Sequence, residues 1–368
     1  MSEEDSIERI MDGRAWDEFC DGLKSARQAL FRAKSPANAF DRAEGYRYLS
    51  RLTRLALEKF VENSDPLVPR FYELSREDAK IGADNPDAFY LNAAVSGEQD
   101  YRIWGTRGTA QYAGLGTYYG NYGSSARSGR SGYLDLDDIE LAPDGSLEII
   151  LSSTPQEGNW LPMEPDTGML IVRQFLLDKS TDEPAELHIE RIGAKAPPVP
   201  LDPVTLDESL EASAAFVKGT ADLFADWVEG YSERPNELNT MPDSIRDGAH
   251  AAPTQIVYHG YWKLAPNEVL VISTTPPECS YWNFQLDNYW MESLDYRYHP
   301  ITVNKHSALL EDDGSLRIVI AHTDPGVPNW MDTAGHRHGT MAMRWNGAED
   351  PPRPHCRVVS LASLANGR

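Results

Sequence analysis

The residues best suited to chemistry are histidines near the end of the chain. His322 and Asp324 follow an apolar, strand-like run, and His336 and His338 lie two positions apart just before another such run. Because residues i and i+2 of an extended strand project to the same face, His336 and His338 would present two imidazoles together. With His322 or Asp324 nearby, they would form a three-ligand metal set or an acid/base cluster. We therefore predict catalytic roles for His322, Asp324, His336 and His338, and we take the three histidines as candidate metal ligands.

A structural alternative stays open for these histidines. The pattern of two spaced histidines followed by a glutamate, typical of cupins, is incomplete here, because residues 339–343 contain no carboxylate. A histidine in a loop can also serve by hydrogen-bonding the backbone. The alternative is that these side chains hold loops in place.

A second candidate is the polar strand at residues 281–290. Alternation places Tyr281, Asn283, Gln285 and Asp287 on one face, and Trp282, Phe284 and Leu286 on the other. The apolar face predicts a core, and the polar face predicts a pocket wall that recognises hydrogen-bonding groups. The predicted substrate-binding residues are Asn283, Gln285, Asn288, Trp290, Trp330 and Arg344.

The chain also contains an internal repeat. Residues 144–151 match 313–320, Asn159-Trp160 matches Asn329-Trp330, and residues 168–173 match 339–344, in the same order and at nearly constant spacing. Residues that both halves share are expected to serve the fold, whereas residues found in one half are freer to serve a site. This argument favours structural roles for the Asn-Trp pairs and for Arg173 and Arg344, and it favours a site among the histidines.

The elements that must position these residues form an α+β fold that is mainly antiparallel β. Short strand-like runs with Asp-Gly turns and no helices between them predict two related jelly-roll or β-sandwich modules, with N-terminal and inter-module helices. We expect a helix to begin at Ser35-Pro36 and to end at residues 63–66, and another to begin at a capping box at Thr205. The predicted regions are a helical part (1–78), the first β module (79–195), a linker with a helix (196–252) and the second β module (253–368).

Composition narrows the function classes. The 368 residues include 34 Lys and Arg against 57 Asp and Glu, a net charge of −23, and 41% hydrophobic residues, as in a globular chain. So acidic a chain would repel nucleic acid and anionic membranes, and we expect neither as a partner. The first ten residues lack the regions of a signal peptide, and three isolated cysteines argue against a disulfide framework. These features predict a cytoplasmic protein.

A Gly- and Tyr-rich segment, residues 114–132, is a candidate lid. It lacks the G-x-x-x-x-G-K-[ST] pattern of a phosphate loop. Arg127 and Arg130 could meet an anionic ligand there, and the alternative is a flexible hairpin connection.

One family resemblance can be stated. Residues 260–264, 281–286 and 329–332, followed by Arg344-Trp345, resemble the bacterial family called domain of unknown function 1214. The resemblance covers about the last hundred residues, with weaker kinship in the first module. It implies jelly-roll-like β modules, often in tandem, and it brings no reaction, cofactor or catalytic residue.

Two functions from different classes therefore remain. The first is an enzyme with little cofactor need, a lyase, hydrolase or isomerase, whose small organic substrate binds at the second module or between modules. The alternative is a non-catalytic protein that binds a small molecule or a carbohydrate. The sequence contains no dinucleotide fingerprint, so no nucleotide cofactor is expected, and it leaves a divalent metal and the oligomeric state open.

Overall fold

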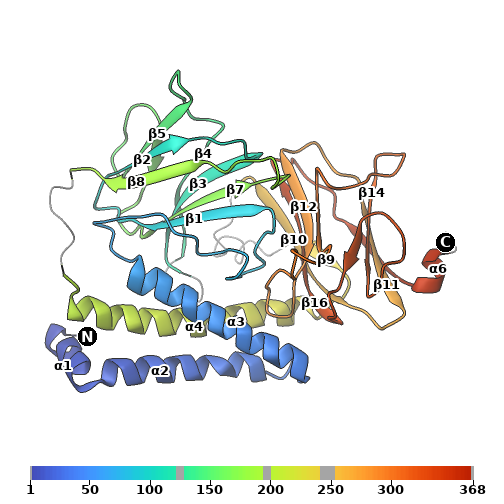
Figure 1. The fold of residues 1–368 in the computed structure, drawn as a ribbon, viewed down its shortest axis with the longest axis horizontal. Helices are drawn as coiled ribbons and strands as arrows, with labels where there is room; N and C mark the ends of the chain where they lie inside the picture. Colours follow the sequence, from blue (N-terminus) through green and yellow to red (C-terminus); the bar gives the residue numbers. More distant parts are fainter. Residues whose placement is uncertain (1, 122–127, 194–199, 241–252, 366–368) are drawn as a thin grey trace.

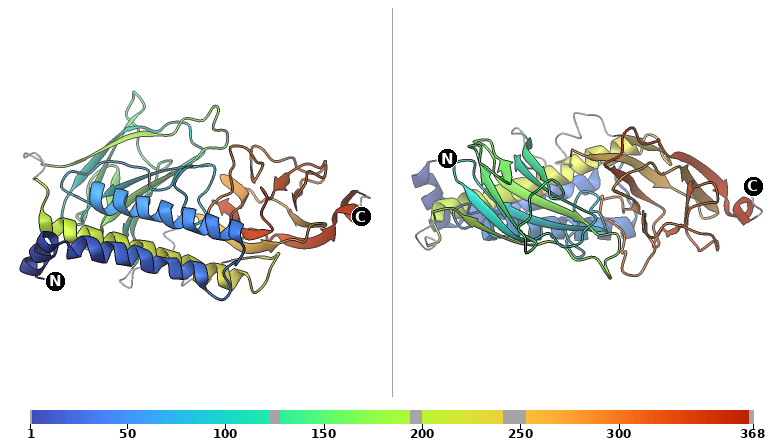
Figure 2. Two further views of the ribbon diagram at one scale, coloured as in Figure 1. Left: turned by 60° about the horizontal axis from the view of Figure 1, so that its bottom comes forward. Right: turned by 90° about the horizontal axis from the view of Figure 1, so that it is seen from above.

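Two β modules lie above a layer of helices in the computed structural model, which describes residues 2–121, 128–193, 200–240 and 253–365 (Figure 1). The modules follow one another along the long axis of the molecule, and helix α4 extends beneath both of them (Figure 2). The α+β class and the two related modules predicted from the sequence are confirmed. Among the described helices, none is both long and apolar enough to cross a membrane.

The helices come before each module and after the second. They are α1 (Glu3–Asp12), α2 (Arg14–Ala26), the 3-10 turn η1 (Arg27–Phe31), α3 (Ala39–Leu57), the π-helical turn η2 (Glu58–Glu62), α4 (Pro203–Tyr231) and α6 (Leu361–Ala365).

Two helix starts differ from the predicted ones. Helix α3 begins after Asn38, whose side chain accepts the backbone N–H of Asp41, whereas the hydroxyl of Ser35 donates to the carbonyl of Ala29 instead. Helix α4 begins after Asp202, whose carboxylate accepts both the N–H and the hydroxyl of Thr205. In both cases a polar side chain just upstream satisfies the free N–H groups of the first turn.

The first module consists of two sheets. Its strands are β1 (Ala88–Ala94), β2 (Tyr101–Thr106), β3 (Tyr112–Tyr119), β4 (Gly129–Asp135), β5 (Ser146–Ser152), β6 (Trp160–Pro162), β7 (Met169–Phe175) and β8 (Glu186–Arg191). The orders are β1-β7-β3-β4 and β6-β5-β2-β8, and a core of buried side chains from both sheets lies between them.

The second module repeats this arrangement. Its strands are β9 (Leu238–Thr240), β10 (Gln255–Lys263), β11 (Glu268–Thr274), β12 (Tyr281–Leu286), β13 (Thr302–Asn304), β14 (Leu316–Ala321), β15 (Trp330–Asp332), β16 (His338–Asn346) and β17 (His355–Ser360). The orders are β13-β12-β16-β10-β9 and β15-β14-β11-β17, so β10 and β16 correspond to β1 and β7. Pairing is antiparallel except at β5–β6 and β14–β15, which are parallel in both modules.

Shared residues within each module have matching structural roles. The amide of Asn159 accepts from the N–H of Glu140 and donates to the carbonyls of Glu140 and Glu148. Asn329 makes the same three bonds with Leu309 and Arg317. These amides close the loop that leads to the parallel strand, which is the structural role expected for them.

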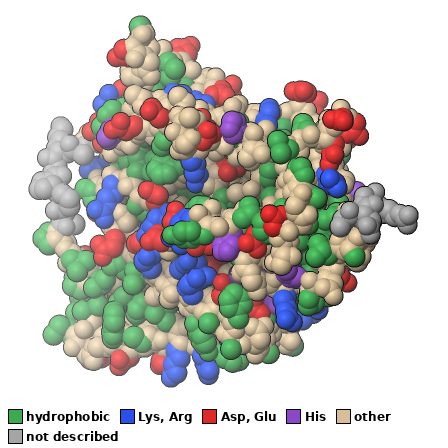
Figure 3. Space-filling model, turned by 45° about the vertical axis from the view of Figure 1, so that its right-hand side comes forward, with side chains coloured by type: hydrophobic (Ala, Val, Ile, Leu, Met, Phe, Trp, Pro, Cys, Tyr) green, Lys and Arg blue, Asp and Glu red, His purple; other side chains and the backbone are tan. Residues whose placement is uncertain are grey.

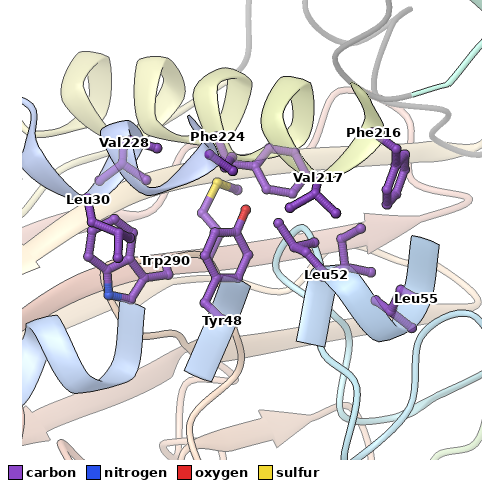
Figure 4. Close-up of a cluster of buried hydrophobic side chains, with 14 of the residues drawn as sticks. Leu30, Tyr48, Leu52, Leu55, Phe216, Val217, Phe224, Val228 and Trp290 are labelled. Atoms are coloured by element: carbon purple, nitrogen blue, oxygen red, sulfur yellow. The ribbon is translucent and has the colours of Figure 1, made fainter. Parts of the chain in front are cut away.

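The helical layer connects the two modules through a shared core. Tyr48 and Leu52 of α3 point toward Phe224 and neighbouring side chains of α4, and Trp290 of the second module packs among them (Figure 4). Tyr48 and Trp290 stack with ring centroids 6.2 Å apart. The second module is therefore anchored on the N-terminal helices by an aromatic side chain of its own.

The acidic excess of the chain does not make a uniformly negative surface. On the face seen in Figure 3, acidic side chains are interspersed with basic ones, and several Lys and Arg side chains gather near its middle. Exposed arginines commonly pair with neighbouring acids, as Arg102 does with Glu148 and Glu190.

Candidate functional site

A cavity of about 170 Å³ lies between the two modules and helix α4. Its walls come from strands β1, β7, β10 and β16, from Phe224 and Trp227 of α4, and from the segment 81–84 that precedes β1. The lining is mostly apolar, with a small number of polar side chains. Concave, largely apolar sites with a few convergent polar groups are the usual form of small-molecule sites.

Equivalent arginines of the two modules both line this cavity. Arg173 lies in β7 and pairs across the sheet with Tyr90 of β1, and Arg344 lies in β16 and pairs with Val257 of β10. All four residues contribute to the lining. Strands β7 and β16 correspond in the repeat. Arg173 and Arg344 are therefore equivalent residues of the two modules, and both line the same cavity.

Arg344 is buried, with 6% of its surface exposed, and it is held from several directions. Its guanidinium donates to the side-chain carbonyls of Gln285 (2.5 Å) and Asn283 (3.5 Å) and to the backbone carbonyl of Ala83 (2.5 Å). Arg173 donates to the hydroxyl of Tyr118 at 2.7 Å. The Arg344 contacts connect β16 to the segment that precedes the first module, so the guanidinium also holds the two modules together.

Three of the described side chains that line the cavity each contain a buried polar atom without a hydrogen-bond partner. These atoms are the side-chain nitrogen of Gln255, Nδ1 of His259 and the hydroxyl of Ser75. His259 is 7% exposed and stacks on Tyr231 with ring centroids 5.6 Å apart, and burial lowers its pKa to about 3. Buried polar groups are normally satisfied, so unpaired donors and acceptors around one cavity indicate a place for a polar ligand.

The predicted wall residues Asn283 and Gln285 lie in a buried network rather than on an open pocket wall. Asn283 donates to Asn85 (2.9 Å), and Gln285 donates to the carbonyl of Asp84 (2.8 Å) and to the carboxylate of Asp287 (2.6 Å). Trp282, Phe284 and Leu286 lie in the core of the second module, as the alternation predicts. The polar face therefore joins the modules and orients Arg344.

Two more predicted binding residues lie in a tight turn and in the helical core. The side chain of Asn288 accepts the N–H groups of Trp290 and Glu292. Trp290 is 3% exposed and donates from its indole to the carbonyl of Asp41. Such burial leaves neither side chain a surface for a ligand in this structure.

His336 and His338 do lie together, and each faces an acid of helix α3. Nε2 of His336 is 2.7 Å from Glu44, and Nε2 of His338 is 3.2 Å from Asp41. Hydrogen bonding and charge attraction from Glu44 outweigh burial and raise the pKa of His336. These contacts connect the start of β16 and the turn before it to the start of α3.

The remaining predicted residues lie elsewhere. His322 contacts the hydroxyl of Thr333 and the carbonyl of Leu264 through its two ring nitrogens, while Asp324 is exposed and accepts the N–H of Gly326. The indole of Trp330 donates to the carbonyl of Ala321. These contacts fit the alternative in which such side chains hold loops.

The histidines are not assembled into a metal set. Across the described ranges, no group of three or more His, Cys, Asp or Glu side chains is arranged to hold a metal ion. The expected cluster of His322, His336 and His338 is therefore not formed, because acids of α3 occupy two of these rings and loop groups occupy the third.

Sequence reasoning missed most of the cavity. The sequence patterns give His259, Tyr90 and Gln255 no role, and they favour a structural role for Arg173. Two signals could have found the site: the arginine shared by both halves, and the alternation of Gln255, Val257 and His259, which places them on one face of β10. Of the predicted binding residues, Arg344 lines the cavity. The candidate lid falls in part on residues 122–127, outside the described residues.

The fold and the cavity define a protein with tandem β modules and a ligand-sized space between them. A family model described as "Protein of unknown function (DUF1214)" matches the chain twice, at residues 92–176 and 266–350, once in each module. The chain belongs to this family. Two matches in tandem agree with the internal repeat and with the two-module structure.

Solved structures include similar chains. A crystal structure of an uncharacterized protein from Burkholderia cenocepacia is 48% identical, with a TM-score of 0.95 over 97% of this chain and 99% of that one. A second crystal structure, of a protein from Vibrio parahaemolyticus, is 12% identical with a TM-score of 0.50 over 92% of this chain and 100% of that one, which shows a common fold alone. No curated protein matches this chain.

Proposed function

We propose that the protein binds a small, partly apolar organic molecule in the cavity between its two modules. The observation that carries this proposal is the set of buried polar atoms without partners around one largely apolar space. An engineered cavity of about 150 Å³ holds benzene, so a cavity of about 170 Å³ suits a molecule the size of a substituted benzene ring.

Binding is favoured over catalysis by the groups that line the cavity. A neutral imidazole whose pKa burial lowers to about 3 is a weak general base at neutral pH, which applies to His259. In the described structure, no hydrogen bond joins His259 to Ser75 or Tyr90, so a nucleophile and base pair is not assembled there. The lyase, hydrolase or isomerase predicted from the sequence stays a prediction that depends on the distant histidines.

The test is a fragment screen against the full chain, read by saturation-transfer NMR. The panel contains toluene, phenol, benzamide, benzoate and benzylamine, which match the cavity in size and differ in charge. Val257→Phe adds a ring to the cavity lining and should abolish binding. Val358→Phe is the matched control, because Val358 is 38% exposed on β17, away from the cavity.

The proposal holds if at least one fragment binds the wild type and Val358→Phe but not Val257→Phe. It is overturned if no fragment binds the wild type, or if Val257→Phe binds as well as the wild type. Circular dichroism should confirm that both variants are folded.

The proposal also includes the location of the protein, the connectivity within its modules and the classes of partner that it does not bind. A cytoplasmic location is supported by three free cysteines, Cys20, Cys279 and Cys356. Jelly-roll connectivity within each module and the absence of nucleic-acid and membrane partners are likewise proposed, the latter from the net charge of −23.

A further inference from the structure

Arg344 is a buried cation whose hydrogen-bond partners in the described structure are all neutral. They are the side-chain carbonyls of Gln285 and Asn283 and the backbone carbonyl of Ala83. Within the described ranges, no carboxylate forms an ion pair with its guanidinium. A buried charge without a counter-charge is costly, so a negative ligand beside Arg344 would gain the attraction that the protein leaves unused.

Three acids lie in the surrounding network, but each is occupied by other donors. Asp84 accepts the N–H and the hydroxyl of Ser293, and Asp87 accepts Tyr281 and Asn304. Asp287 accepts Gln285. Burial raises the pKa of Asp87, and it raises the pKa of Asp287 to about 7, so Asp287 is only partly ionised at neutral pH.

The cavity lining also offers several hydrogen-bond donors, although the acid Asp84 belongs to the same lining. A guanidinium has five N–H groups, and the three bonds of Arg344 leave two for a ligand. The unpartnered side-chain nitrogen of Gln255 and the hydroxyl of Ser75 are further donors in the lining. Arg173 brings a second guanidinium to the same lining.

We propose that the ligand is a small monocarboxylate with an aromatic ring or a branched apolar chain, bound through its carboxylate to Arg344. This inference rests on the proposed binding function and adds the chemical class of the ligand. A carboxylate has two oxygens, which match the planar fork of an arginine. The apolar part would lie against the side chains that make up most of the lining, among them Phe224, Trp227 and Met291.

The experiment measures binding to the full chain by isothermal titration calorimetry with benzoate, its neutral analogue benzamide, and inorganic phosphate. Benzoate should bind at least tenfold more tightly than benzamide, and phosphate should not bind. Arg344→Met should weaken benzoate at least tenfold and leave benzamide unchanged. Arg337→Met, at an exposed position of the loop before β16, is the matched control and should bind as the wild type does.

Each other outcome separates this inference from the proposed function. Equal affinity for benzoate and benzamide, or an unchanged benzoate affinity in Arg344→Met, overturns the carboxylate inference and leaves small-molecule binding standing. Phosphate binding without benzoate binding also overturns it. If neither these probes nor any fragment of the panel binds, both proposals fail.

Two further variants test the inference if Arg344→Met does not fold. If circular dichroism shows that Arg344→Met is unfolded, Arg344→Lys retains the charge and should keep the preference for benzoate over benzamide. Arg173→Met then replaces a guanidinium that is only half-buried, and it should reduce that preference. Two results together contradict recognition of a negative ligand. The first is that Arg173→Met prefers benzoate over benzamide as strongly as the wild type does. The second is that Arg344→Lys loses this preference although it keeps the positive charge.

Discussion

Replacing Asp287 by asparagine should stabilise the protein, and increasingly so as the pH rises. Asp287 follows strand β12 and is fully buried. Its carboxylate accepts the side-chain N–H of Gln285 at 2.6 Å and the hydroxyl of Thr340 at 3.3 Å. Burial raises its pKa from 3.8 to about 7, even though both bonds and the charge of Arg344 lower it.

The direction in which stability changes with pH follows from the number of protons bound in the folded and unfolded states. Between about pH 4 and pH 7 the folded protein keeps the proton of Asp287 and the unfolded chain releases it, so stability falls with rising pH. At 1.36 kcal/mol per pKa unit, the shift from 3.8 to about 7 destabilises the folded state by up to about 4 kcal/mol at pH 8 and by about 0.5 kcal/mol at pH 4. Asparagine has nearly the same shape, and its amide can still accept from Gln285 and donate to the hydroxyl of Thr340.

The assay is guanidinium unfolding of the wild type and Asp287→Asn between pH 4 and pH 8, followed by tryptophan fluorescence and circular dichroism. The difference in unfolding free energy should grow across this range and level off above pH 7. Asp312→Asn, at an exposed turn, is the matched control for the substitution itself. If the curves of the wild type and Asp287→Asn run parallel, Asp287 ionises normally and the argument from burial is refuted.

Three further predictions concern stability. Glu44→Gln removes the acid that raises the pKa of His336, so it should cost about 1.5–3 kcal/mol at pH 6 and progressively less as the pH rises through that raised pKa, as checked by urea unfolding at several pH values. Trp290→Ala should cost about 3–5 kcal/mol, because it empties the core between the helices and the second module, and calorimetry should show a lower melting temperature. Asn159→Ala and Asn329→Ala each remove three hydrogen bonds and should cost about 2–3 kcal/mol, with the larger loss at Asn329, whose φ of 51° alanine disfavours, and a smaller loss for Asn329→Ala than for Asn159→Ala in chemical denaturation would contradict this reasoning.

The fold was largely predictable, because its signals are local or repeated. Alternation and apolar runs locate β7 and β5, and the Asp-Gly turns lie directly before β5 and β14. The strand before each of these turns belongs to the other sheet of its module, so neither turn closes a hairpin between named strands. The starts of α3 and α4 were less predictable, since several polar residues upstream could each cap the first turn. Which of them does so depends on competing bonds such as that of Ser35 to Ala29.

The candidate site was poorly predictable, because contacts distant in sequence decide which polar residues remain available. His338 begins strand β16 and His336 lies in the turn before it, and acids of α3, almost 300 positions away in the chain, contact both rings. Asn283 and Gln285, predicted to form a pocket wall, are buried instead, and their partners are Asn85 and Asp84 in the segment before the first module. No pattern within the second half of the chain contains this information.

The internal repeat contains two kinds of shared residue. A residue that both halves share serves the fold when its partners lie in its own module, as those of Asn159 and Asn329 do. The same argument does not extend to a residue on the face where the modules meet. At that face, equivalent residues of the two modules lie around one cavity, as Arg173 and Arg344 do. Duplication of a module can therefore place two guanidiniums around one cavity without any change in the module's own pattern.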